Sequence, residues 1–352
     1  DKKDMNRAIQ HNGGGYVGGN RFDSGLSGFN GLSSKRFSSF VLTAILVISV
    51  FAVLLPMAGT AEAATPIYVN GTTGNDTNNG ETPETAVKTI AKGIELVDPE
   101  GTVCVAAGRY TPDGEADRWI IIDKPLTLQG ENKKTTVIDG EGKIGELVLI
   151  NANNVTFTGF TVTNARDYGI SINELTTPIT GIKIKDNIVH GISREYGAAI
   201  AGQRFSGEIE GNEIYDGGSS GISFAALDGN VSVNITSNCI YDNSEGIVFW
   251  GESSYFVNAN ITGNEIHNNK YGIYLYSQIG NVEIHCNDIY GNTEYGVFNN
   301  VDKVVDATHN WWGDASGPGG VGPGTGDNIS ANVTYDPWLP MEFQYCPECG
   351  GV

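Results

Sequence analysis

The chain has 352 residues, of which 48 are glycine and only 18% are charged. Its 41 acidic side chains outnumber its 21 basic ones and give a net charge of -20. This acidity argues against a protein that binds nucleic acid through the phosphate backbone. The glycine content and the low charge argue against helical bundles, coiled coils and charge-rich disordered chains. They favour many short strands joined by turns.

The N-terminal part carries an export pattern. Residues 1–34 are polar and glycine-rich, and we expect a disordered extension there. Two basic residues then precede an uncharged run from Phe40 to Gly59, and a small-residue motif ends at Ala63. This order is typical of a secretion signal, although the apolar run is also long enough to span a bilayer. We therefore expect residues 35–63 to be a signal peptide or a membrane anchor, the chain's only contact with a membrane. The protein is then secreted or held at the cell surface.

A repeat of about 25 residues follows. Five segments align on an asparagine that has an isoleucine three residues before it and an isoleucine or valine two residues after it. A second marker keeps the same period, a glycine that opens a short apolar strand. The asparagines are Asn187, Asn212, Asn238, Asn264 and Asn287. The marker glycines are Gly169, Gly197, Gly221, Gly246, Gly272 and Gly296.

This period predicts the coils of a parallel β-helix. It is too short for a propeller blade and leaves no room for a ten-residue helix. Coils would stack at the strand spacing of about 4.8 Å. The isoleucines would then form interior stacks, and the asparagines would bond from coil to coil. We expect the marker glycines to free the backbone at another turn. Residues 102–310 have room for about eight coils.

Both ends of such a stack need covering. Residues 82–97 read as an N-terminal cap helix with Thr82 as N-cap and Pro83 as its first residue. Its apolar face would carry Val87, Ile90, Ala91, Ile94 and Val97. We expect residues 64–101 to form the N-terminal cap segment, residues 311–340 a tryptophan-containing closure, and residues 341–352 a cysteine-containing tail.

Three segments resemble a known family. The sequence YVNGTTGNDTNNGETPETAVKTIAKGI resembles the N-terminal cap of the right-handed parallel β-helix repeat proteins, and NWWGDASGPGG followed by YDPWL resembles their closing segment. The resemblance implies an all-β, right-handed parallel β-helix, exported as in archaeal surface proteins. Relatives include pectate-lyase-like polysaccharide lyases and hydrolases, CASH-type sugar-binding modules and NosD-like copper-associated proteins. A fold with so many uses does not identify a function.

Two acidic and two basic residues are the candidate catalytic group. Asp167 and Glu195 each stand two residues before a marker glycine, which would place them about 5 Å apart on successive coils. This separation suits a retaining glycosidase or half of a calcium site. Arg166 and Arg194 would stabilise the anionic intermediate of a lyase. The alternative is an exposed ladder of ion pairs, which is worth little energy.

An outward row of rings is the candidate carbohydrate-binding surface. It lies three residues after the repeat asparagines and consists of His190, Tyr215, Tyr241, His267 and Tyr290. Such a row could stack on a polysaccharide or a cell-surface glycan, and Trp250, Tyr255 and Tyr274 would extend it. The alternative is that aromatic residues simply suit strands and stack on each other.

No metal site is expected from the histidines. His190 and His267 would lie about three coils apart, too far to share a copper ion, so we expect no cofactor and leave only Ca²⁺ open. Cys239 and Cys286 would lie two coils apart, too far for a disulfide. The Cys346-Pro-Glu-Cys349 motif is half of a zinc-ribbon spacing or a local disulfide.

These features together favour an exported β-helix protein that binds carbohydrate or has a structural role. The alternative is a polysaccharide lyase or glycoside hydrolase that acts on an anionic polysaccharide. We expect no nucleic-acid partner.

Overall fold

Strands with alternating inward and outward side chains make up most of this structure, a computed structural model that describes residues 65–173, 177–252 and 254–343. The predicted extension, the hydrophobic segment of residues 35–63 and most of the cysteine-containing tail lie outside the described residues. Within the described ranges, no helix is long and apolar enough to cross a membrane.

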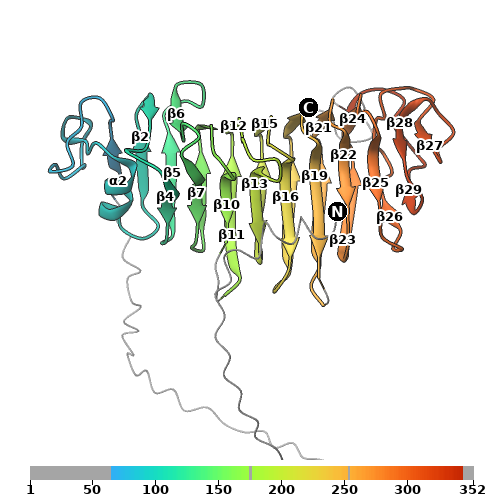
Figure 1. Cartoon of the computed structure of the whole chain (residues 1–352), viewed down its shortest axis with the longest axis horizontal. Coiled ribbons are helices and arrows are strands. Elements are labelled where there is room, and N and C mark those ends of the chain that lie inside the picture. Colours follow the sequence, from blue (N-terminus) through green and yellow to red (C-terminus); the bar gives the residue numbers. More distant parts are fainter. Residues whose placement is uncertain (1–64, 174–176, 253, 344–352) are drawn as a thin grey trace, which may run out of the picture. The chain divides into compact units, whose positions relative to one another are not determined.

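The strands form a parallel β-helix of about nine coils, one more than predicted. The coils follow one another from α2 at the blue end to β27 at the red end (Figure 1). Each full coil contributes one strand to each of three sheets, and every strand pair in the described residues is parallel. Residues at equivalent positions of successive coils therefore lie side by side.

The bounds of the strands follow the repeat. The eleven-stranded sheet contains β1 (Ile67–Val69), β2 (Thr102–Val105), β5 (Leu126–Gly130), β8 (Val155–Thr158), β11 (Ile179–Lys185), β14 (Phe205–Glu210), β17 (Val231–Thr236), β20 (Val257–Thr262), β23 (Ile279–His285), β26 (Val305–Asp306) and β29 (Val333–Thr334). The ten-stranded sheet contains β4 (Ala116–Ile122), β7 (Ile144–Ile150), β10 (Tyr168–Ile172), β13 (Ala198–Gln203), β16 (Ser220–Ala226), β19 (Glu245–Gly251), β22 (Tyr271–Leu275), β25 (Tyr295–Asn299), β27 (Pro318–Gly320) and β28 (Gly326–Ile329). The eight-stranded sheet contains β3 (Gly108–Tyr110), β6 (Thr136–Asp139), β9 (Thr161–Thr163), β12 (Ile188–His190), β15 (Glu213–Tyr215), β18 (Cys239–Tyr241), β21 (Glu265–His267) and β24 (Asp288–Tyr290).

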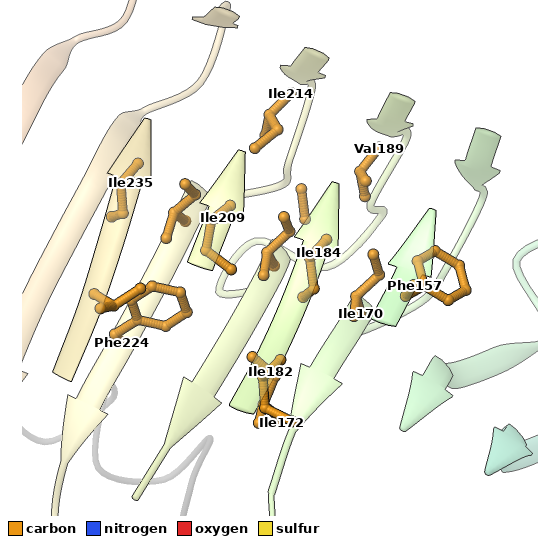
Figure 2. Close-up of a cluster of buried hydrophobic side chains, with 14 of the residues drawn as sticks. Phe157, Ile170, Ile172, Ile182, Ile184, Val189, Ile209, Ile214, Phe224 and Ile235 are labelled. Carbon is orange, nitrogen blue, oxygen red and sulfur yellow. The ribbon is translucent and has the colours of Figure 1, made fainter. Parts of the chain in front are cut away.

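The predicted isoleucine stacks form the core. Ile184, Ile209 and Ile235 are fully buried and paired in register on β11, β14 and β17. Figure 2 shows them on successive strands, together with Val189 and Ile214 of a second stack. Because each inward residue packs on the equivalent residue of the next coil, the core is continuous along the helix axis.

The predicted asparagine ladder is confirmed. The side chain of Asn238 is only 1% exposed. Its Oδ1 accepts hydrogen bonds from the backbone N and from Nδ2 of Asn212, both at 3.0 Å. Its Nδ2 donates to Asn264 Oδ1 at 2.9 Å and to the carbonyl oxygen of Ile209 at 2.8 Å. The ladder continues one coil further than predicted, to Asn310.

In each coil, one residue of this turn adopts the left-handed backbone conformation. The residue before each ladder asparagine has a positive φ, whether or not it is a glycine. These residues are Asp186, Gly211, Ser237, Gly263, Cys286 and His309.

The role predicted for the marker glycines is wrong, because Gly221, Gly246 and Gly272 do not have positive φ. They permit close approach instead. A Cβ on Gly246 would lie 2.6 Å from the carbonyl oxygen of Gly272 in the next coil, closer than real Cβ contacts. A second ladder runs beside them, in which Asn243 donates to Asn269 and Asn269 to Asn292, both at 3.0 Å.

The N-terminal cap is split into two helices, so the single helix predicted over residues 82–97 is wrong. The 3₁₀ helix η1 (Pro83–Thr85) has Thr82 as its N-cap, as predicted, and the α-helix α2 (Ile90–Leu96) begins after Thr89. Between them, Val87 forms a β-bridge with Val69 of β1, which requires an extended backbone.

The predicted apolar face of the cap is correct except at one position. Ile90, Ile94 and Val97 are buried, whereas Ala91 is exposed. At the other end of the stack, Trp312 is fully buried and Trp311 is half-buried. Both ends of the core are therefore covered by apolar side chains.

Candidate functional site

Three of the four predicted catalytic residues meet where β10 begins. Arg194 Nη1 donates to Asp167 Oδ1 at 2.9 Å, and Arg166 Nη2 donates to Asp167 Oδ2 at 3.4 Å. The same guanidinium of Arg166 lies 3.5 Å from the exposed carboxylate of Asp117. The Asp167 side chain is 15% exposed and both arginines are close to half-exposed. Both oxygens of Asp167 are thus engaged by guanidinium groups.

The fourth residue, Glu195, does not lie opposite Asp167. Tyr168 pairs with Ala198, so the position opposite Asp167 belongs to Gly197, two residues beyond Glu195. Glu195 is exposed and makes no ion pair within the described part of the chain. The predicted register, which aligned Gly169 with Gly197, is therefore wrong by two residues, because this coil is longer than the repeat.

A second carboxylate, which the repeat pattern did not indicate, extends this group. Glu146 on β7 lies 3.4 Å from Arg118 Nε and accepts a 2.8 Å hydrogen bond from Ser171 Oγ. Tyr168 is paired with Glu146 in register. Burial raises the pKa of the Tyr168 hydroxyl, Glu146 raises it further, and Arg194 opposes the change. We call Arg118, Glu146, Arg166, Asp167 and Arg194 the arginine–carboxylate cluster.

The predicted ring row exists on the outer face of the eight-stranded sheet. Successive ring centroids lie 4.6, 5.0, 5.1 and 5.0 Å apart, with interplanar angles between 5° and 14°. Since each ring face lies against the next ring, the row presents mainly ring edges to solvent. Tyr241 donates to Glu213 at 2.9 Å and Tyr290 donates to Glu265. Burial and these carboxylates raise the pKa of both tyrosines, whereas burial lowers the pKa of His190.

The residues expected to extend this row lie elsewhere. Trp250 belongs to β19 and Tyr274 to β22, both in the ten-stranded sheet, and Tyr255 lies between β19 and β20. Tyr274 joins a separate aromatic cluster on the outer face of that sheet. Ring centroids within it lie 4.8 to 6.1 Å apart, and most ring pairs are tilted or edge-on. The aromatic cluster consists of Tyr271, Tyr274, Tyr276, Tyr295 and Phe298.

A band of mostly short side chains, which also contains Glu245, separates the arginine–carboxylate cluster from the aromatic cluster. On the outer face of the ten-stranded sheet, the register runs from Tyr168 through Ala198, Ser220 and Glu245 to Tyr271. Ala201 and Ser223 continue the short side chains in the neighbouring row. Four coil steps span about 19 Å at the usual strand spacing. The two clusters therefore stand at the ends of one band of the surface.

One group with spacing suited to a metal ion occurs in the described ranges: Cys239, Glu265 and His267 on the eight-stranded sheet. Cys239 has a free thiol, and burial followed by the neighbouring carboxylates raises its pKa to about 12. Cys286 is engaged in a disulfide, while Cys346 and Cys349 lie outside the described residues. The expectation of Ca²⁺ stays a prediction.

Comparisons with known proteins agree with this architecture. Residues 145–310 match the family described as the right handed beta helix region. The crystal structure of pectate lyase Pel9A superposes with a TM-score of 0.58 at 17% identity, over 78% of each chain. An alginate lyase from Paenibacillus sp. str. FPU-7 gives a TM-score of 0.44 at 15% identity, over 70% of this chain and 96% of its own. None of the curated proteins matches in sequence. At 17% identity the pectate lyase is alike in fold alone, and residues 145–310 of this chain form a segment of the right-handed parallel β-helix family.

Proposed function

We propose that this protein is exported and binds a polysaccharide on the outer face of its ten-stranded sheet. The observation that carries the proposal is the aromatic cluster. Its five rings are half-buried, which fixes them while leaving part of each ring in contact with solvent. Because neighbouring rings are tilted, their faces are not fully covered by one another. Aromatic side chains with partly exposed faces suit the apolar faces of sugar rings.

The surroundings of the aromatic cluster support this proposal. Glu245 and Val248 lie beside Tyr271 and Tyr274 in the preceding coil. The serine and alanine side chains of the coils before it leave space above the sheet for a chain that lies along the helix axis. A net charge of -20 disfavours anionic ligands at long range. We therefore expect a neutral polysaccharide to bind better than an anionic one. The ring row on the eight-stranded sheet is a less suitable platform, because its ring faces lie against each other.

A lyase or hydrolase acting on an anionic polysaccharide is the second candidate. The observation in its favour is the arginine–carboxylate cluster, which gathers three guanidinium groups around two carboxylates. Guanidinium groups are suited to bind sugar carboxylates. The fold is compatible with such chemistry, since a pectate lyase adopts it.

Polysaccharide pull-down with the full chain tests both candidates. The chain is incubated with insoluble neutral and anionic polysaccharides, the pellet reports binding, and mass spectrometry of the supernatant reports products. Replacing Tyr274 and Phe298 by alanine should weaken binding at least tenfold, equivalent to about 1.4 kcal/mol. The exposed Tyr196 provides the matched control, since Tyr196→Ala removes a ring outside the cluster.

Each outcome separates the candidates. Binding without products, lost in the Tyr274→Ala/Phe298→Ala variant, supports the proposal. Binding that is lost instead in Tyr215→Ala would move the site to the ring row. Oligosaccharide products that disappear in Asp167→Ala and Arg194→Ala, but not in Glu195→Ala, would establish the enzyme. Neither binding nor products would favour a structural role.

A further inference from the structure

Three side chains of different chemistry converge on the outer face of the eight-stranded sheet. Cys239 on β18 pairs in register with Glu265 on β21. His267 follows Glu265 by two residues on the same strand, so both side chains point to the same face. None of these residues belongs to the arginine–carboxylate cluster or to the aromatic cluster.

The three side chains approach one another pairwise at similar distances, and Glu265 uses a different carboxylate oxygen toward each of the other two. Cys239 Sγ lies 3.8 Å from Glu265 Oε2 and 3.8 Å from His267 Nε2, and His267 Nε2 lies 3.9 Å from Glu265 Oε1. A tetrahedral zinc ion with bonds of about 2.3 Å to sulfur and about 2.0–2.1 Å to nitrogen and oxygen needs donor atoms roughly 3.3–3.6 Å apart. With one ligand atom from each residue, the three atoms lie within 4.8 Å of one another, so a rotation of the Glu265 carboxylate is needed to bring one oxygen toward both partners.

Neighbouring residues hold the ligands in place. The ring of His267 is stacked between Tyr241 and Tyr290, with centroid distances of 5.1 and 5.0 Å and interplanar angles of 5° and 6°. Its buried Nδ1 has no hydrogen-bond partner, so the polar contacts of the ring are all made by Nε2. Tyr290 donates to Glu265 and fixes its carboxylate. Such surrounding contacts are what orient ligands at metal sites.

The local charge also favours a cation. Glu213, Glu265 and Asp288 lie in the same row as Cys239, which occupies the position between Glu213 and Glu265. No lysine or arginine among the described residues forms an ion pair with any of these three carboxylates. A divalent cation bound by Cys239, Glu265 and His267 would compensate this accumulation of negative charge.

We propose that Cys239 Sγ, a carboxylate oxygen of Glu265 and His267 Nε2 bind one zinc ion. The ligand set decides the metal, because thiolate and imidazole suit Zn²⁺, whereas Ca²⁺ takes six to eight oxygen ligands. The ion ties two successive coils together and leaves its fourth position to water. This proposal departs from the expectation of no metal site, which did not consider Cys239 together with His267.

Metal binding by the full chain tests the proposal. After incubation with Zn²⁺ and gel filtration, elemental analysis should find one zinc per chain. Co²⁺ in its place should give the charge-transfer absorption of a cobalt–thiolate bond. Cys239→Ser should abolish that absorption, and both Cys239→Ser and His267→Gln should weaken zinc affinity at least 100-fold. Cys104→Ser, which removes the other free thiol of the described residues, is the matched control and should change neither.

A second readout keeps the test independent of folding defects. Zinc should raise the melting temperature of the unmodified chain and of Cys104→Ser, because it binds the folded state, but not that of Cys239→Ser. Circular dichroism checks that each variant is folded, and Glu265→Gln is a nearly isosteric third variant, expected to weaken binding. The absence of bound zinc in the unmodified chain would overturn the proposal. So would a cobalt–thiolate absorption that persists in Cys239→Ser.

Discussion

The asparagine ladder makes a quantitative prediction, because one side chain serves three different coils. Asn238→Ala removes four hydrogen bonds at a position that is 1% exposed. One group is left without its partner in the interior, the backbone N–H of Asn212, since Ile209 stays paired within the ladder of β14 and β17. Asn264 Oδ1 keeps its bond from the backbone N of residue 238, which the substitution does not alter.

The expected destabilisation depends on the buried polar group that loses its partner rather than on the number of hydrogen bonds removed. A buried donor or acceptor left unpaired costs about 1–3 kcal/mol. One such group predicts a loss of about 1–3 kcal/mol in the free energy of unfolding, a substantial share of the stability of an ordinary domain. The matched control is Asn234→Ala, the same chemical change at an exposed position of β17. The control should change stability by less than about 0.5 kcal/mol.

Urea unfolding followed by circular dichroism measures both variants. Coils of a repeat protein can unfold separately, so hydrogen exchange of the segment containing Asn212 provides a local measurement. Exchange there should be faster in Asn238→Ala than in Asn234→Ala. Equal stability and equal exchange in the two variants would refute the reasoning, since the ladder would then contribute nothing beyond an exposed amide.

Three further predictions concern close packing, pH and the closure of the stack. Gly246→Ala should cost about 1–3 kcal/mol in urea unfolding, because its Cβ would meet the carbonyl oxygen of the next coil, whereas Gly114→Ala has open space and should be neutral. Burial raises the pKa of Asp288 to about 6, above its ordinary value of 3.8. The protonated Asp288 side chain therefore stabilises the folded state fully below about pH 4, and this stabilisation is lost as the pH rises through 6. Between pH 4 and pH 7, the free energy of unfolding of Asp288→Asn should rise by on the order of 2 kcal/mol relative to that of the unmodified chain. Identical pH profiles of the two proteins would contradict this assignment. Trp312→Ala should cost about 3–5 kcal/mol, measured as a lowered melting temperature, because it empties a fully buried site at the end of the core.

The sequence was sufficient to predict the fold because the interior of a solenoid repeats. Every coil must fill the same space, so Ile184, Ile209 and Ile235 recur at a constant offset and bury against one another. The ladder asparagines obey the same constraint. A second ladder could have been found in the same way, since Asn243, Asn269 and Asn292 each follow a ladder asparagine by five residues.

The site was harder to predict because its residues come from successive coils, and their alignment depends on the strand register across one coil of irregular length. The coil after Gly169 is long, and the strand pairing places Ala199 rather than Gly197 in the glycine row. An error of two residues in the register separates a surface side chain from its expected partner, and for this reason Glu195 does not lie opposite Asp167. Glu146 belongs to a coil before the regular repeats, so no alignment of the asparagines could have joined it to Asp167.

The spacing of the coils decides which outward rings can meet a ligand. Coils lie about 4.8 Å apart, which is also a favourable distance for stacked rings. A row with a ring in every coil therefore stacks on itself, as from His190 to Tyr290, and its ring faces are used within the protein. Tyr274 has Val248 on one side and the edge-on ring of Phe298 on the other, so it cannot join such a stack. In a parallel β-helix, an uninterrupted aromatic row thus stabilises the fold, and an interrupted, tilted group of rings is the better indication of a binding surface.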